Sequence, residues 1–204
     1  MIEQFIKHIF PRYILKNNLK ITYTFCFGGL ALTSFLILIF SGVLLIFYYI
    51  PTIEGAYDSI LMIEKDVFLG RYIRAIHYIS GIFFFISLFL HTLRVIFTSA
   101  FTRGYNFIVG LLILFLSLFE GYTGYILPMD QISYWAGVTG MELIKTVPLG
   151  DEVVSILFPD RLTGNLSLIR VYILHIIIMP GLIVILTSIH FYKIRKDKGI
   201  LPYL

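Results

Sequence analysis

The run from Ile21 to Ile53 contains no charged residue, and this feature constrains the fold more than any other in the chain. A helix needs about 20 mainly apolar residues to cross the hydrocarbon core of a bilayer. We therefore expect this run to hold a membrane-spanning helix that ends near Pro51. The composition agrees, since 58% of the residues are hydrophobic and only 14% are charged, whereas about a quarter of a soluble protein is charged.

Three further apolar stretches predict membrane helices at about 71–98, 105–127 and 168–194, the last kinked at Pro180. The expected fold is all-α, a four-helix transmembrane bundle formed by residues 21–204. Residues 1–20 alternate basic and apolar side chains, which predicts an amphipathic helix on the membrane surface. The 130–167 connection is too long for a plain turn, and its apolar residues predict short helices on the outer surface.

The lysines and arginines predict the orientation of the bundle. When the adjoining ends of the spans are included, ten of them fall before the first span, between the second and third, or after the fourth, whereas the other two connections hold six together with nine acidic residues. The positive-inside rule then places both termini on the inner side of the membrane. This distribution accounts for the net charge of +4 without nucleic acid as a partner.

Two of the expected spans carry a histidine near each end. His77 and His91 lie fourteen residues apart on the second, and His175 and His190 lie fifteen apart on the fourth. These two spans run in the same direction, so the histidines pair by depth at two levels roughly 21–23 Å apart. Two imidazoles from facing helices are a suitable axial pair for haem iron. The pattern predicts two haems b stacked between the two helices, one held by His77 and His175 (outer) and one by His91 and His190 (inner).

Other interpretations of the histidines remain open from the residues alone. They are four unrelated intramembrane histidines, a metal site, or a proton path in a transporter or channel. A metal site needs its ligands in one cluster, which the predicted spacing does not give. A transporter is expected to be colourless, so the presence of haem separates that class from the others.

Glycines on the first and third spans repeat the histidine spacing. Gly28 and Gly42 are fourteen residues apart, as are Gly110 and Gly124. The topology places Gly28 and Gly110 at the inner haem level and Gly42 and Gly124 at the outer level, where a missing side chain lets a flat macrocycle approach the backbone. Packing between small residues of neighbouring helices is the alternative.

Arginines accompany each histidine on the side nearer the membrane surface. They are Arg74, Arg94, Arg170 and Arg195. A guanidinium there is suited to a haem propionate, and an arginine that extends from a helix end to water is the alternative. Glu120 lies near the outer end of the third span, either as a proton relay or, as we favour from the sequence, as an interfacial side chain that reaches water.

The chain resembles the b6 type of the cytochrome b family, the four-helix N-terminal half of cytochrome b, over nearly its whole length. The matching segments are Cys26–Gly29, Phe47–Thr52, Ile73–His77, His91–Val95, Thr123–Trp135 and Ile194–Lys196. The fifteen-residue histidine spacing also resembles the b6 type, whereas mitochondrial-type cytochromes b use fourteen.

The resemblance implies a diheme subunit of a quinol:cytochrome c (or plastocyanin-like) oxidoreductase in a bacterial inner membrane or thylakoid. A quinol is then oxidised at an outer site, one electron goes to a Rieske iron–sulfur protein and a c-type cytochrome, and the other crosses by way of the outer and inner haems to an inner quinone site, with proton translocation. The family's Pro-Glu-Trp-Tyr segment is absent. The implied partners are therefore a separate subunit carrying the C-terminal half, the Rieske protein and the cytochrome, in a dimeric complex.

The single cysteine, Cys26, excludes an internal disulfide. In b6-type proteins a cysteine at this place forms one thioether to an additional c-type haem, so the resemblance implies a covalent haem at Cys26. Packing is the alternative. A diheme membrane anchor of a dehydrogenase or hydrogenase is the alternative function, although it gives no reason for the glycine pairs.

Overall fold

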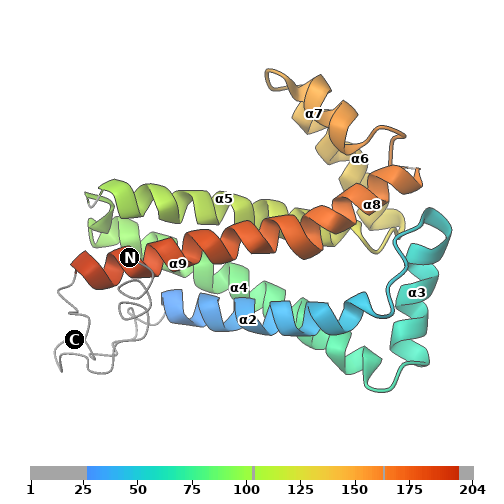
Figure 1. The fold of residues 1–204 in the computed structure, drawn as a ribbon, viewed down its shortest axis with the longest axis horizontal. Helices are drawn as coiled ribbons and strands as arrows, with labels where there is room; N and C mark the ends of the chain where they lie inside the picture. The colour runs from blue at the N-terminus through green and yellow to red at the C-terminus, as the bar shows by residue number, and fades with distance from the viewer. Residues whose placement is uncertain (1–26, 103, 163, 198–204) are drawn as a thin grey trace. The chain divides into compact units, whose positions relative to one another are not determined.

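The computed structural model describes residues 27–102, 104–162 and 164–197. All regular elements among these residues are helices, and four helical stretches are long and apolar enough to cross a membrane (Figure 1). They are α2 (Phe27–Ile46), α4 (Gly70–Phe97), α5 (Gly104–Ile126) and the continuous stretch Asn165–Ile194. The all-α, four-span fold expected from the sequence is confirmed. The surface helix expected at 1–20 and Cys26 lie outside the described residues.

The fourth span is built from three helical segments. These are α8 (Asn165–Ile173), one π-helical turn, η3 (Leu174–Ile178), and α9 (Met179–Asp197). In the π turn the Met179 N–H donates to the Leu174 carbonyl, five residues back. The turn ends two residues before Pro180, whose ring in a regular α-helix would meet the carbonyl four residues earlier. The expected distortion at Pro180 therefore takes the form of a π turn, and His175 lies within it.

The connections between the spans also contain helices. α6 (Gln131–Lys145) and α7 (Gly150–Leu157) are the short helices expected in the long connection, and η2 (Ala100–Thr102) is a single 3-10 turn. α3 (Ile53–Lys65) was not expected. The first span was expected to end near Pro51, but α2 ends at Ile46. The reason is that Thr52 begins a new helix there, its hydroxyl accepting from the Gly55 N–H at 3.0 Å.

The contacts within the chain divide it into two compact units. Among the described residues, unit 1 comprises 27–35, Ile82–Ser117 and 181–197, and unit 2 comprises Leu36–Gly81 and Leu118–Pro180. Each of the four spans contributes residues to both units. His91 and His190 fall in unit 1, and His77 and His175 fall in unit 2. Each histidine pair is therefore contained within one unit.

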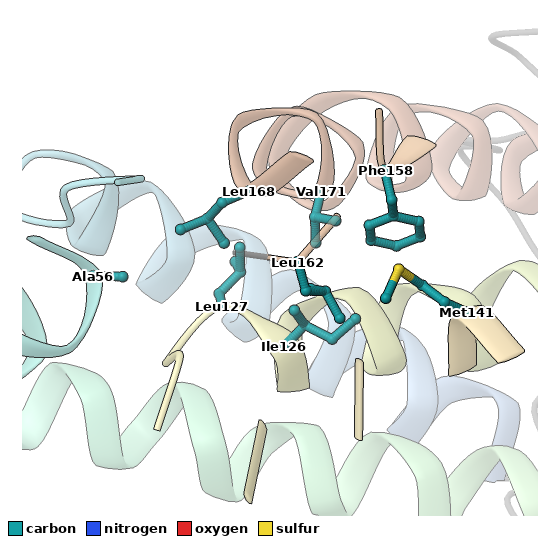
Figure 2. Close-up of a cluster of buried hydrophobic side chains, with 8 residues drawn as sticks. All are labelled: Ala56, Ile126, Leu127, Met141, Phe158, Leu162, Leu168 and Val171. Atoms are coloured by element: carbon teal, nitrogen blue, oxygen red, sulfur yellow. The ribbon is translucent and has the colours of Figure 1, made fainter. Parts of the chain in front are cut away.

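Unit 2 has a hydrophobic cluster that joins the ends of its helices (Figure 2). Leu168 and Val171 of α8 meet Ile126 of α5 there, and all three are no more than 1% exposed. The other members are Ala56, Leu127, Met141, Phe158 and Leu162. The cluster fixes the helix that leads into His175 against the end of the helix that carries Gly124.

A tyrosine links the end of the first span to the end of the third. The Tyr49 hydroxyl donates to the Leu127 carbonyl at 2.6 Å, and its ring lies 5.3 Å from that of Tyr172. Burial, and then the neighbouring Tyr172, raise the pKa of the Tyr49 hydroxyl. It therefore stays protonated and able to donate at every physiological pH.

Two aspartates stabilise helix starts in unit 2. Asp130 precedes α6 and accepts from the Ser133 N–H at 2.8 Å, a contact that contributes most to lowering the pKa of its carboxyl group. Asp160 accepts from the Ser167 hydroxyl and from the Leu166 and Ser167 N–H groups at 2.9 Å. The hydroxyl contact is the largest cause of the lowered pKa of Asp160. Both carboxylates satisfy N–H groups that have no partner inside the helix.

Candidate functional site: two histidine pairs

The His77–His175 pair brings together α4 and the π turn within unit 2. The two ring centres are 6.3 Å apart and the ring planes are inclined at 78°. Both rings lie inside membrane-spanning helices. The sequence had assigned these two residues to one site, and the structure places them together.

The Nδ1 atom of each of these histidines has hydrogen-bonding partners. His77 Nδ1 lies 3.0 Å from the Ser41 hydroxyl of α2, and that hydroxyl donates to the Ile37 carbonyl at 2.7 Å. The hydroxyl oxygen is therefore left to accept from an Nδ1–H group. In this tautomer the Nε2 atom of His77 has a free lone pair, as a metal ligand requires.

His175 Nδ1 is surrounded by three oxygen atoms of α5. The Glu120 carbonyl and the Glu120 carboxylate Oε1 each lie 3.1 Å away, and the Thr123 hydroxyl lies 3.3 Å away. Glu120 and His175 side chains are each 16% exposed. The carboxylate therefore faces the histidine rather than water, which contradicts the interfacial position favoured from the sequence.

The His91–His190 pair brings together α4 and α9 within unit 1. The ring centres are 6.5 Å apart and the planes are inclined at 82°. Neither Nδ1 atom makes a hydrogen bond of normal geometry to any residue that the structure describes, although the Asn106 backbone lies near His190. A buried imidazole nitrogen without a protein partner is a group that a ligand or an ordered water would have to satisfy.

Each histidine ring rests against one of the four glycines. If each glycine carried a Cβ atom, that atom would lie close to Cε1 of the facing histidine. In unit 2 the distance would be 3.1 Å from Gly42 to His77 and 2.6 Å from Gly124 to His175. In unit 1 it would be 3.2 Å both from Gly28 to His91 and from Gly110 to His190. The glycines therefore make room for the edge of the imidazole, and the room for a macrocycle that the sequence predicted beside them stays a prediction. At Gly124 any larger residue would displace the ring, whereas at the other three glycines a Cβ atom would require a shift of a few tenths of an ångström.

The pairs satisfy a simple test for a shared iron atom. A metal between two imidazoles lies near 2.0 Å from each nitrogen, so the ring centres fall roughly 6 Å apart or slightly more. The observed 6.3 and 6.5 Å agree with this requirement. No cluster of three or more His, Cys, Asp or Glu occurs among the described residues. Two nitrogens per site are too few for a bare zinc ion, but they are sufficient for haem, whose macrocycle supplies the other ligands.

The arginines expected near the propionates have mixed surroundings. Arg74 forms an ion pair with Glu64, and Arg170 donates to the Ile156 carbonyl, in both cases within unit 2. Arg94 is in the last turn of α4, three residues after His91. The side chain of Arg195 lies outside the described part of the chain. Propionate binding by these four residues stays a prediction.

A separate cavity of about 450 Å³ lies beside α6 and α7. None of the histidines, glycines or arginines discussed above contributes to it. Its lining residues are Tyr134, Val138, Met141, Glu142, Lys145, Val154, Phe158, Arg161 and Leu162.

Comparison with known proteins identifies the family. The family model described as "Cytochrome b/b6/petB" matches residues 13–198. The chain belongs to the cytochrome b family. It is 39% identical to "Cytochrome b6" of Heliomicrobium gestii, over 84% of this chain and 82% of the relative. It is 34% identical to the "Menaquinol:cytochrome c reductase cytochrome b subunit" of Bacillus subtilis (strain 168), over 93% of this chain and 87% of the relative.

A solved structure of the family shares the fold. The chain matches a chain of the "Hyperthermophilic respiratory Complex III" with 31% sequence identity and a TM-score of 0.80. The match covers 87% of this chain and 48% of the other, so this chain spans about half the length of that solved chain. Membership of the family makes the protein a multi-pass, haem b-binding membrane cytochrome of the bc/b6f type. It also separates the chain from diheme membrane anchors and from transporters.

Sequence reasoning did not find the partners of the histidines on the neighbouring helices. Ser41 precedes His77 by thirty-six residues, but it is adjacent to Gly42, so the glycine spacing pointed to its turn of α2. Thr123 is adjacent to Gly124, so the glycine spacing already pointed to its turn of α5. The contact of Glu120 with His175 follows from the same turn, because Glu120 lies one helical turn before Gly124.

Proposed function

We propose that the chain is the diheme cytochrome b subunit of a quinol:cytochrome c, or quinol:plastocyanin-like, oxidoreductase complex. It would carry electrons between an outer quinol site and an inner quinone site and contribute to proton translocation. The observation that supports this most directly is the geometry of the two histidine pairs. In each pair the ring centres are spaced for one iron atom, and each ring packs against a glycine.

The residues have separate roles in this proposal. His77 and His175 hold the outer haem, and His91 and His190 hold the inner haem, through Nε2. When bound, haem supplies reversible one-electron oxidation and reduction. Ser41 and Thr123 fix the ring tautomer in the outer pair, and the four glycines permit the close approach of each ring. The propionates are assigned to Arg74, Arg94, Arg170 and Arg195.

The orientation and the partners follow from charge and relatedness. The excess of basic residues near the two termini assigns them to the inner, cytoplasmic or stromal, side. The named activity of the Bacillus subtilis relative supports a quinol as electron donor. We assign as partners a separate subunit carrying the C-terminal half of cytochrome b, a Rieske iron–sulfur protein and a c-type cytochrome, in a dimeric complex.

Cys26 is assigned a covalent c-type haem on the inner side. The support is the Cys-Phe-Gly-Gly sequence, in which Gly28 is the glycine that receives the His91 ring. Cys26 itself lies outside the described residues, and the assignment rests on the resemblance to b6-type proteins.

A haem assay on the purified chain tests the proposal. The pyridine haemochrome spectrum is expected to report two extractable b haems, and haem staining of a denaturing gel is expected to report a third, covalent haem that is lost in Cys26→Ala. Two b haems without covalent haem would remove the role of Cys26 and leave the rest. A colourless chain would refute the proposed function.

A further inference from the structure

Glu120 is an acidic residue placed inside a membrane-spanning helix. Its Oε1 atom lies 3.1 Å from His175 Nδ1, and its Oε2 atom is buried without a hydrogen-bonding partner among the described residues. An ionisable group at such a depth is costly and usually functional. The group that it faces is one of the histidines assigned to iron.

The surroundings of His175 Nδ1 determine which nitrogen carries the proton. The Glu120 carbonyl can only accept, and the Thr123 hydroxyl already donates to that carbonyl at 2.9 Å. The carboxylate Oε1 completes a set of three acceptors. Nδ1 is therefore the protonated nitrogen, and it donates to Glu120 while Nε2 faces its ligand.

A carboxylate contact of this kind is found at one of the four histidines. His77 Nδ1 has the neutral hydroxyl of Ser41 as its partner. His91 Nδ1 and His190 Nδ1 make no hydrogen bond of normal geometry within the described part of the chain. The two pairs are alike in ring separation, but among the described residues a carboxyl group lies beside the ring of His175 and beside none of the other three.

We propose that Glu120 is a positioning residue that lowers the reduction potential of the haem held by His77 and His175. It does so by holding the His175 ring in its ligating tautomer and by making that imidazole a stronger donor to iron. The inference rests on the proposed function, because it assumes that His175 is an axial ligand.

Two effects of the carboxylate act in the same direction. An acceptor on the second nitrogen of a ligating histidine raises the basicity of the ligand, which favours the ferric state. In its ionised form Glu120 also places a negative charge in a low-dielectric site, which favours the state of the haem with one more positive charge. Both effects make reduction harder at this site and leave the His91–His190 site unaffected.

Potentiometric titration of the haem-loaded complex, purified from membranes, tests the inference with Glu120→Gln. Glutamine keeps an acceptor oxygen at nearly the same position but removes the charge. We expect the equilibrium constant for reduction of the outer haem to rise about tenfold, which is roughly 59 mV for one electron. The low-spin electron paramagnetic resonance signal of the same haem is expected to shift, while that of the inner haem stays in place.

A matched control is available in Glu142→Gln. Glu142 is 63% exposed and paired with Lys145 at 2.7 Å, so this variant removes one carboxylate without contact with a histidine. Both haem potentials are expected to stay unchanged in it. A His77→Ala complex, expected to lack the outer haem, assigns the two redox waves. An unmoved outer wave in Glu120→Gln, or an equal shift of both waves, would overturn the inference.

A second variant keeps the inference testable if Glu120→Gln loses the outer haem. Glu120→Asp keeps the charge but withdraws it by one methylene group, and a smaller upward shift of the outer wave is expected. If both variants lose the outer haem, Glu120 is a folding residue and the proposal is wrong. A wild-type complex without two b haems refutes the proposed function itself, whereas two haems with immovable potentials refute only the role of Glu120.

Discussion

The His77–His175 and His91–His190 pairs have nearly the same skeleton and different surroundings. Their ring centres are 6.3 and 6.5 Å apart, and each ring lies on a glycine of another helix. In unit 2, however, the Nδ1 atoms contact a hydroxyl group and a carboxylate. In unit 1 the Nδ1 atoms make no hydrogen bond of normal geometry to the described residues.

The comparison distinguishes the residues that hold the haem from the residues that alter its properties. The glycine and histidine positions are repeated in both units, so they set the spacing that an iron atom needs. Side chains in contact with Nδ1 are not repeated, and such contacts alter the basicity and the tautomer of a ligating histidine. We therefore expect variants at repeated positions to change occupancy, and variants at unrepeated positions to change potential or stability.

The largest effect is expected from removal of a histidine. His175→Ala should lose one b haem and keep the other, and His190→Ala should do the same for the other pair, because each site has two protein ligands. The haemochrome stoichiometry per chain is expected to fall from two to one in each variant. Full haem content in either variant would break the assignment of the pairs.

The next effect is expected at the glycines, with a difference between the pairs. A methyl group at Gly124 would lie 2.6 Å from His175 Cε1, whereas at Gly28 it would lie 3.2 Å from His91 Cε1. Overpacking of a well-fitted site costs about 1–3 kcal/mol. Gly124→Ala should therefore lose haem and lower the melting temperature more than Gly28→Ala does, as measured by haem absorbance during a thermal ramp. Equal losses would show that the two pairs tolerate a Cβ equally.

A smaller effect is expected from Ser41→Ala. The variant removes the hydroxyl that accepts from the His77 N–H, in a position where the serine is 2% exposed, although the Leu38 backbone also lies near His77. An unsatisfied buried donor costs about 1–3 kcal/mol, so the melting temperature of the complex should fall. Ser188→Ala is the control, because the hydrogen bond of that hydroxyl in the described part of the chain goes to the Val184 carbonyl of its own helix. A melting temperature as high as that of the control would mean that the hydroxyl does not support His77.

The smallest effect is expected from Asp160→Asn, and it should depend on pH. The folded state depresses the pKa of Asp160, chiefly through the Ser167 hydroxyl. A depressed carboxyl pKa contributes stability above the unfolded pKa, near 3.9, and this contribution disappears as the pH falls through the folded value. The variant should therefore melt below the wild type at pH 7 and converge with it in strong acid. A pH-independent difference would assign the effect to packing.

Hydropathy predicted the four spans well, because a bilayer demands long apolar helices whatever their tertiary contacts. α3 escaped prediction because it is a half-polar helix of 13 residues, and its start depends on the cap at Thr52. The histidine pairs could be inferred from spacing along each helix. The glycine spacing also indicated the turns that hold Ser41 and Glu120, but their contacts with Nδ1 could not be inferred, because the approach of these side chains depends on how the helices pack.

The π turn at Leu174–Ile178 has a consequence for counting residues along the fourth span. An α-helix rotates about 100° per residue, so fourteen residues end roughly 40° short of whole turns and fifteen end about 60° past them. One residue absorbed by the wide turn makes fifteen steps equivalent in phase to fourteen. The longer interval between His175 and His190 is thus a one-residue insertion, and the π turn restores the angular relation of the two histidines that the insertion would otherwise change. In an alignment it should appear as a one-residue gap beside Pro180, and relatives with the shorter interval are expected to have a regular α-helix at this point.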